Sequence, residues 1–297
     1  MVHARTRQGQ WLGYVLIAPL ALWLAATMLY PLAVTVRISV SSVGIIGTGG
    51  GFSGWSNYAA VLSSPLFREA GVRSLEWVVG NAILQTALAF VTALVLNEKL
   101  RGRAFARTWI VVSWVVPTVV IAIIGRWMLN GAVGVIQYLL LTTHLVRAPV
   151  DFFGDPSTAL ATTIVINSWH WFPFLAVILL ASLQSVPQEY YEAAAIDGAS
   201  AWGRFRAVTW PALQPTMFVL GLIGTLWSVN IFDVIWLLTQ GGPANGTTTL
   251  PVYIYEQAFQ AFNMGGAAAA SMIMGVALFL FAALYLRCAA PREEGWA

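Results

Sequence analysis

The side chains that most often carry out enzymatic chemistry are few in this sequence, and their spacing forms no catalytic pattern. The histidines His3, His144 and His170 lie far apart, and the single cysteine, Cys288, excludes a disulfide framework, a thiolate zinc site and an iron–sulfur cluster. The Gly-x-x-x-x-Gly-Lys-Ser/Thr loop that holds nucleotide phosphates does not occur. The sequence therefore predicts a protein that binds or conducts rather than one that catalyses.

One serine lies in a short string that some intramembrane proteases share. Residues Gly51-Phe52-Ser53-Gly54 match the Gly-x-Ser-Gly string of rhomboid serine proteases, but they lie in the glycine-rich run 47–54, outside any apolar stretch. A nucleophile there would lack both a dry site and an intramembrane histidine base. We interpret this segment as a flexible loop, and we do not expect an enzyme.

Two groups of aromatic and polar residues, each with helical spacing, are better candidates for a binding site. The spacing i, i+3, i+4, i+7 places each group on one helical face. Aromatic rings beside amide and hydroxyl groups suit a sugar, which offers flat C–H faces and hydroxyls. A packing role for both faces stays open, and so does a neutral histidine bonded to a backbone carbonyl. The first face is formed by Asn167, His170, Trp171 and Phe174, and the second by Gly224, Trp227, Ser228 and Ile231.

The composition shows which kind of element must position these residues. Of the 297 residues, 59% are apolar and only 9% are charged, whereas soluble proteins carry about 25% charged residues. The mean hydropathy is +0.75. This balance excludes a soluble enzyme. The net charge of +3 is too small for a nucleic-acid interface, so the expected surroundings are a lipid bilayer.

Six stretches are long and apolar enough to cross a bilayer, which needs roughly 20 residues each. The sequence therefore predicts an all-α polytopic membrane protein, a single domain over residues 1–297 with six transmembrane helices. Pro117 and Pro173 should kink the third and fourth spans. The predicted spans are about 12–35, 75–96, 107–129, 159–183, 212–238 and 267–286.

The distribution of basic residues orients these spans. Basic residues gather on the cytoplasmic side of membrane proteins, so both termini and the loop 185–211 should be cytoplasmic. The inner segments then hold Arg5, Arg7, Lys99, Arg101, Arg103, Arg107, Arg204, Arg206, Arg287 and Arg292, against Arg37, Arg68, Arg73 and Arg147 outside. Arg126 stays within the third span, at a depth similar to that of Asp233, and an ion pair between the two is possible.

The inner loop between the fourth and fifth spans should contain two short helices. Ser185 and Gln188 form a capping box with Pro187 in the first turn, and Gly198 can adopt the left-handed conformation that ends a helix. Ser200 can cap a second helix that ends before Pro211. Glu192 then stands beside a run of small side chains, which suits the groove of a partner protein.

This loop resembles the EAA loop of ABC-importer permeases. The resemblance continues through most of the chain from the second span onward, to the branch of sugar importers that includes the maltose and glycerol-phosphate permeases. In the loop it rests on Glu192, Ala193, Ala194, Asp197, Gly198, Ala199, Phe205, Val208, Pro211, Leu213 and Pro215; outside the loop it rests on Leu100–Arg103 with Arg107 and Pro117, Phe152–Pro156, Phe232–Asp233, Leu238–Thr239, Gly241–Pro243 and Thr247–Thr249.

The resemblance implies a type I importer in the bacterial cytoplasmic (inner) membrane. This chain would pair with a second, homologous permease, rest on two ATPase subunits and receive a carbohydrate from an extracytoplasmic sugar-binding protein or lipoprotein. It would bind no cofactor itself, because ATP and Mg would be held by the ATPase subunits. The loop would provide the coupling helix, with Glu192, Ala193, Ala194, Asp197 and Gly198 at the ATPase.

The resemblance also implies a sugar pathway along the two faces described above. This sequence has Ser228 and Ile231 where the maltose-type permease has amides, so the cavity should prefer a different sugar. Two other functions stay open: an importer permease for another polar solute, such as an amino acid or glycerol phosphate, and a secondary transporter. A secondary transporter should show inverted repeats and a charged ion site, and neither is evident in the sequence.

Overall fold

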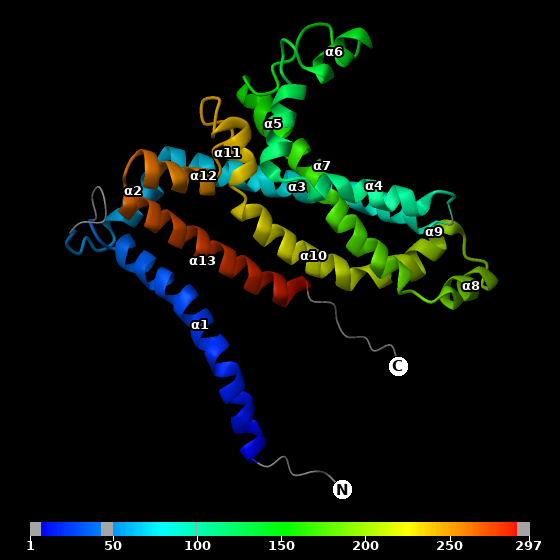
Figure 1. Ribbon diagram of the computed structural model, residues 1–297, viewed down its shortest axis with the longest axis horizontal. Helices are drawn as coiled ribbons and strands as arrows, with labels where there is room; N and C mark the ends of the chain where they lie inside the picture. The colour runs from blue at the N-terminus through cyan, green and yellow to red at the C-terminus, as the bar shows by residue number, and fades with distance from the viewer. Residues whose placement is uncertain (1–6, 43–49, 99, 290–297) are drawn as a thin grey trace. The chain divides into compact units, whose positions relative to one another are not determined.

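The computed structural model describes residues 7–42, 50–98 and 100–289, and every regular element in these ranges is a helix (Figure 1). Arg5, Lys99, Arg292 and both chain ends, which entered the orientation argument, lie outside the described residues. The chain forms two compact units. One comprises residues up to Ser64 together with Ile254–Gly275, and the other comprises Pro65–Tyr253 together with residues from Val276 onward. The single domain stays a prediction.

The smaller unit contains the first helix and the segments that pack at its C-terminal end. It is formed by α1 (Arg7–Ser39), α2 (Ser56–Ser63), η3 (Glu256–Gln260) and the first part of α13 (Met264–Ala289). The Asn57 amide donates hydrogen bonds to the carbonyls of Ser39 and Ser41, at 2.9 and 3.0 Å, just beyond the last turn of α1. The same amide lies 3.4 Å from the Ser53 hydroxyl, so Ser53 belongs to a turn that precedes α2.

The larger unit holds the remaining helices, among them the long helices that carry both predicted faces. Their bounds are α3 (Pro65–Asn97), α4 (Arg103–Val115), α5 (Thr118–Met128), α6 (Val135–Thr142), α7 (Pro156–Gln184), α8 (Gln188–Ile196), α9 (Ala201–Arg204), η2 (Phe205–Thr209), α10 (Trp210–Asn230), α11 (Asp233–Thr239) and α12 (Leu250–Tyr255), with α12 continuing into the smaller unit.

The described helices agree with up to six membrane crossings, although two of the predicted spans are broken. Five helices are long and apolar enough to span a bilayer: Gly13–Ser39, Pro65–Asn97, Pro156–Gln184, Ala201–Asn230 and Met264–Cys288. The third predicted span consists of α4 and α5, which meet at an angle of 93°. The break is sharper than the expected kink, because Pro117 takes an extended ψ of 139° and becomes the N-cap of α5.

The fifth predicted span, 212–238, is wrong at its C-terminal end. α10 ends at Asn230, and Ile231 takes an extended conformation with φ −67° and ψ 121° before α11 begins at Asp233. Apolar residues continue through this break, so hydropathy alone did not reveal it. The C-terminal parts of the two broken spans, α5 and α11, pack together in one core with Trp77, Leu160 and Ile166.

α3 and α7 pack closely along their lengths and form the centre of the larger unit (Figure 1). A Cβ atom at Gly80 would lie 2.8 Å from the Ile164 Cδ1 atom, so a side chain at this position would displace the end of Ile164. α7 starts where the Asp155 carboxylate accepts hydrogen bonds of 2.8 Å from the backbone N–H and the hydroxyl of Ser157. These bonds stabilise the charged form and lower the pKa of Asp155.

Candidate functional site

A cavity of about 280 Å³ lies between α3, α7 and α10. Six of the eight residues predicted for a substrate pathway line it, which places the fourth and fifth predicted spans around one space. They are Trp171, Phe174, Gly224, Trp227, Ser228 and Ile231, and the lining is completed by Gln85, Leu175, Asn230 and Asp233.

Aromatic rings from three helices form a continuous cluster at this cavity. The Trp227 ring lies 6.3 Å from the Trp171 ring and 6.1 Å from the Phe174 ring, measured between centroids. Phe174 stacks on Trp114 of α4 at 5.1 Å, with 28° between the ring planes. The sequence reasoning did not include Trp114, because its helix ends at the break before Pro117. Such a cluster offers flat apolar faces for the C–H face of a ring-shaped ligand.

Asn167 is not among the residues that line the cavity. Its side chain is fully buried, and its Nδ2 atom donates a 2.7 Å hydrogen bond to the Oδ1 atom of Asn81 on α3. The Asn81 Oδ1 atom also accepts hydrogen bonds from Gln85 Nε2 at 3.0 Å and from the Ser168 hydroxyl at 3.2 Å. This amide network joins α3 to α7. Asn81 and Gln85 were missed by the sequence reasoning, although two amides four residues apart in an apolar span could have identified them.

His170 is likewise buried away from the cavity, with 3% of its surface exposed. Its Nδ1 atom lies 2.7 Å from the backbone carbonyl of Ser113. A carbonyl only accepts, so Nδ1 carries the proton and donates it. In an unbroken helix this carbonyl would accept from residue 117, but Pro117 has no N–H. His170 therefore supplies the hydrogen bond that the proline removes, as expected for a core histidine bonded to a backbone carbonyl.

Replacing His170 by phenylalanine should destabilise the protein at this break. The ring is retained, but the buried Ser113 carbonyl loses its donor, which typically costs about 1–3 kcal/mol. The measurement is the Tm of the purified complex, with Trp169→Phe as the control because the Trp169 side chain on the same helix is exposed. Equal Tm values for the two variants would contradict this role.

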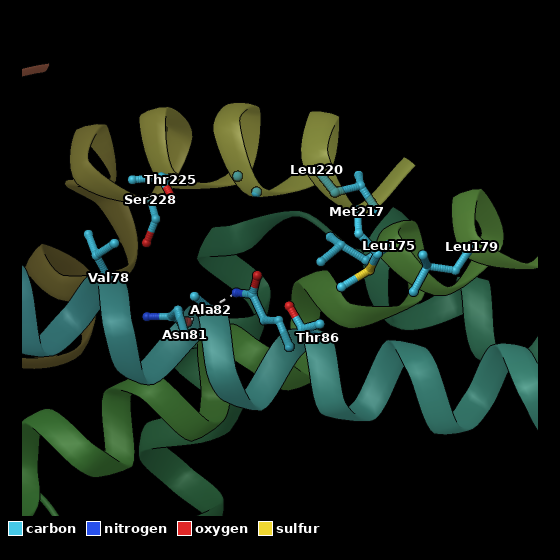
Figure 2. A pocket seen from close by; sticks show the side chains of 13 residues that line it. Val78, Asn81, Ala82, Thr86, Leu175, Leu179, Met217, Leu220, Thr225 and Ser228 are labelled. Atoms are coloured by element: carbon cyan, nitrogen blue, oxygen red, sulfur yellow. Dashed lines mark hydrogen bonds between the residues drawn. The ribbon is translucent and has the colours of Figure 1, made fainter. Parts of the chain in front are cut away.

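A second, smaller cavity of about 90 Å³ adjoins the first between the same three helices (Figure 2). Both linings include Gln85, Leu175, Gly224 and Ser228. Figure 2 shows Asn81 and Ser228 on facing helices, while Leu175, Leu179 and Met217 lie at the opposite end of the space. Along α7 and α10 these apolar residues are nearer to α8 than the aromatic cluster is. The smaller cavity thus extends from the level of Asn81 and Ser228 toward the α8 side.

The ion pair between Arg126 and Asp233 that the sequence left open is not formed in the described part of the chain, where Arg73 and Glu76 pair at 2.9 Å. Each charge instead occupies a favourable helix end. Arg126 lies in the last turn of α5 and Asp233 in the first turn of α11, where the helix dipole stabilises a cation and an anion respectively.

Within the described residues, no three histidine, cysteine, aspartate or glutamate side chains gather as a metal site would require.

The loop between α7 and α10 contains a largely exposed helix, α8, none of whose residues is buried. Its end is as predicted. Gly198 has φ +78°, its N–H donates to the Ala195 carbonyl, and the Ala199 N–H donates to the Ala194 carbonyl. This pair of hydrogen bonds forms a Schellman motif, in which glycine adopts the left-handed conformation most easily.

The predicted start of this helix is wrong. α7 continues to Gln184, so Ser185 becomes its C-cap and the Ser185 hydroxyl donates to the Ser182 carbonyl at 2.8 Å. Pro187, rather than Ser185, is the N-cap of α8. Pro187 restricts the residue before it to extended conformations. A serine that is needed to end one helix cannot cap the next.

The second short helix begins as predicted but does not stop before Pro211. The Ser200 hydroxyl accepts a hydrogen bond from the Gly203 N–H at 3.2 Å. The chain then passes through the π-helical turn η2 directly into α10. In that turn the Trp210 N–H donates to the Phe205 carbonyl, five residues back. The wide turn directly precedes Pro211, which has no N–H to donate.

Two contacts attach this loop to the helices that line the cavity. The Tyr191 hydroxyl of α8 lies 3.2 Å from the Thr209 hydroxyl, immediately before α10. The Phe205 ring packs edge-on against Phe90 of α3, with 5.9 Å between centroids. Ile196 at the end of α8 has 87% of its surface exposed. The loop therefore presents an apolar tip while its base is held by α3 and α10.

Comparisons with known proteins identify close likenesses for this arrangement. The family described as "Binding-protein-dependent transport system inner membrane component" matches residues 85–292. A probable ABC transporter permease protein of Brucella suis is 33% identical over 97% of this chain and 99% of its own. The trehalose/maltose transport system permease protein MalF of Thermococcus litoralis is 32% identical over 95% of both chains.

A solved structure has the same fold. It is a bacterial alginate ABC transporter in complex with an alginate pentasaccharide-bound periplasmic protein. The likeness has a TM-score of 0.83 at 22% sequence identity, over 95% of each chain.

Proposed function

Since the chain belongs to the family of binding-protein-dependent transport system inner membrane components, we propose that it is the permease subunit of an ATP-driven importer of carbohydrates. The observation that carries this proposal is the cavity between the apolar helices α3, α7 and α10, which is lined by Trp171, Phe174 and Trp227 together with the polar side chains of Gln85 and Ser228. Its curated relative from Thermococcus litoralis carries the name of a trehalose/maltose system.

A neutral carbohydrate fits this lining better than the alternative substrates do. The described lining includes the carboxylate of Asp233 and no arginine or lysine. A phosphate ester such as glycerol phosphate would meet a like charge without a compensating cation. An amino acid would leave its carboxylate equally unpaired. A di- or oligosaccharide, with apolar ring faces and hydroxyls, can use both the rings and the polar groups.

The energy for transport should come from partner subunits. We infer that this chain is non-catalytic, that it pairs with a second homologous permease, and that two ATPase subunits bind ATP and Mg. The exposed helix α8 with Glu192, Ala193, Ala194, Asp197 and Gly198 is the proposed contact with one ATPase. Its attachment through Tyr191 and Phe205 supports a rigid connection from ATPase closure to α3 and α10.

An extracytoplasmic sugar-binding protein or lipoprotein is the proposed donor of the carbohydrate. The test is ATP-dependent uptake into proteoliposomes by the complete complex, purified through a tag on this chain and supplied with its binding protein. Labelled maltose, trehalose and lactose are compared with glycerol 3-phosphate and histidine. We expect uptake of at least one of the disaccharides. Uptake of glycerol 3-phosphate or histidine alone would overturn the carbohydrate assignment.

The proposed orientation places both termini and α8 in the cytoplasm. In a Cys288→Ser background, Ser200→Cys should resist a membrane-impermeant maleimide in intact cells, whereas Phe52→Cys should react. Ser200 and Phe52 are both exposed in the structure, and Phe52 is a better reporter than the half-buried Ser53. Permeabilised cells provide the control, since both variants should then react. Labelling of Ser200→Cys from outside would reverse the orientation.

A further inference from the structure

Gln85 on α3 occupies the place where the two cavities meet. Of the polar side chains around them, those of Gln85 and Ser228 are common to both linings. The other residues common to both are Leu175 and Gly224, which offer no side-chain hydrogen bond. A polar ligand that moves from the aromatic cavity toward α8 would therefore meet these two side chains first.

The Gln85 amide is held in one orientation by a buried network. Its Nε2 atom donates to Asn81 Oδ1 at 3.0 Å, and Asn81 is 1% exposed. Asn81 cannot turn freely, because its Nδ2 atom donates to the Trp77 carbonyl at 2.8 Å. Its Oδ1 atom also accepts hydrogen bonds from Asn167 and Ser168. One Nε2–H is engaged in this way and orients the amide, so Oε1 is left as its acceptor for a ligand in the cavities, beside the second Nε2–H.

The facing side chain on α10 is also available. The Ser228 hydroxyl is buried and has no hydrogen-bond partner among the described residues. Buried polar groups are normally hydrogen-bonded, so an unpartnered hydroxyl beside a cavity points to a partner that enters from it. Its backbone is fixed, because the Trp77 indole N–H donates to the Ser228 carbonyl at 3.0 Å. Gln85 and Ser228 thus provide an acceptor and a hydroxyl with preset positions.

We propose that Gln85 is a specificity-determining residue of the carbohydrate pathway, and that its amide oxygen accepts a hydrogen bond from a sugar hydroxyl where the aromatic cavity opens into the smaller one. This inference rests on the proposed function. The smaller cavity, at about 90 Å³, has room for a few water molecules of about 30 Å³ each, so it is too small for a whole disaccharide. One hydroxyl group at its mouth is the fitting occupant.

The test uses the complete importer in proteoliposomes, with maltose, trehalose, lactose and their monodeoxy derivatives as probes. Gln85→Met keeps the length of the side chain and removes its hydrogen-bonding groups, while Gln85→Asn retains an amide one methylene shorter. Thr86→Val is the matched control, because Thr86 lines the smaller cavity but not the larger one. Half-saturating sugar concentration and maximal uptake rate are measured for each variant, together with the ATPase rate.

In the wild type, one monodeoxy derivative should need about a tenfold higher half-saturating concentration than the parent sugar. In Gln85→Met, the parent sugar should show that tenfold loss, and removing the same hydroxyl should cause no further loss. Such non-additivity identifies a direct contact, which a packing defect would not produce. Gln85→Asn should lie between the wild type and Gln85→Met, and Thr86→Val should behave as the wild type.

Each other outcome has a defined meaning. If Gln85→Met weakens all derivatives by one common factor, or has no effect, the inference is overturned while the proposed function stands. If the complex with Gln85→Met does not assemble, the parent sugar and its monodeoxy derivative are compared in Gln85→Asn instead. If the losses from the substitution and from the missing hydroxyl simply add in that variant, the inference is overturned. A wild-type complex that imports none of the three disaccharides would overturn the proposed function, and this inference with it.

Discussion

Replacing Gly198 by valine is expected to abolish sugar-stimulated ATP hydrolysis while the complex still assembles. Gly198 has φ +78° at the end of α8, and a left-handed conformation costs an L-residue about 1–2 kcal/mol, with β-branched residues the worst accommodated. The terminal turn of α8 should unwind and displace Asp197 and the exposed Ile196. The coupling surface would then no longer fit the ATPase.

The measurement is the ATPase rate of reconstituted complexes with and without sugar-loaded binding protein. Gly198→Asn is the matched control, because asparagine tolerates the left-handed conformation and should keep most of the stimulation. No atom lies within 4 Å of a Cβ at this position, so the backbone conformation, rather than a clash within the chain, distinguishes the two variants. Equal stimulation in valine and asparagine variants would place the coupling contact elsewhere.

Glu192→Ala should be the milder change in the same helix. Glu192 is exposed on α8, and no residue of that helix is buried. Loss of an ion pair with an ATPase arginine would cost about 2–5 kcal/mol in a dry interface and much less at a wet rim. A complex of Glu192→Ala that is more impaired than Gly198→Val would contradict this order.

Replacing Trp227 by alanine is expected to reduce sugar uptake by about 5- to 150-fold, which corresponds to about 1–3 kcal/mol for a lost stacking surface. Trp227 is 53% exposed, lines the larger cavity and contacts both Trp171 and Phe174. Uptake at a fixed sugar concentration is measured in proteoliposomes. Trp227→Phe, which keeps an aromatic face, should retain most of the uptake.

Asn167→Ala should have a different consequence from Trp227→Ala. Asn167 lies in the buried amide network with Asn81 rather than in the cavity lining. Its removal should therefore lower the Tm of the complex more than it changes the half-saturating sugar concentration. Normal uptake and normal Tm in both variants would mean that the two faces serve neither purpose.

The sequence by itself determined the features that depend on local chemistry. Hydropathy located the long apolar helices but not their ends or the break at Ile231, because a bilayer requires a minimum apolar length and sets no exact boundary. The end of α8 at Gly198 was predictable, since the left-handed cap depends on glycine alone. The resemblance in the loop 185–215 led to the family that the comparisons then showed. Each of these features can be evaluated within one stretch of chain.

Only the tertiary structure determined which hydrogen-bond partner or cavity each polar side chain faces. Helical spacing placed Asn167, His170 and Trp171 on one face, but two of the three bond to other helices and one lines the cavity. A buried polar group needs a partner, and that partner can come from a distant segment or from a ligand. Asn81 lies 86 residues before Asn167, and no periodicity within a single helix can reveal such a pairing.

The helix breaks at Pro117 and Ile231 also involve contacts with other helices. A proline within an apolar helix either bends the helix or ends it. The outcome depends on whether another group donates a hydrogen bond to the backbone carbonyl that the proline leaves without a donor. His170 supplies that donor for Ser113, and the Trp77 indole bonds the Ser228 carbonyl near the end of α10. These donors belong to α7 and α3. Donors from other helices therefore satisfy a backbone carbonyl near each break, and hydropathy along one helix cannot indicate them.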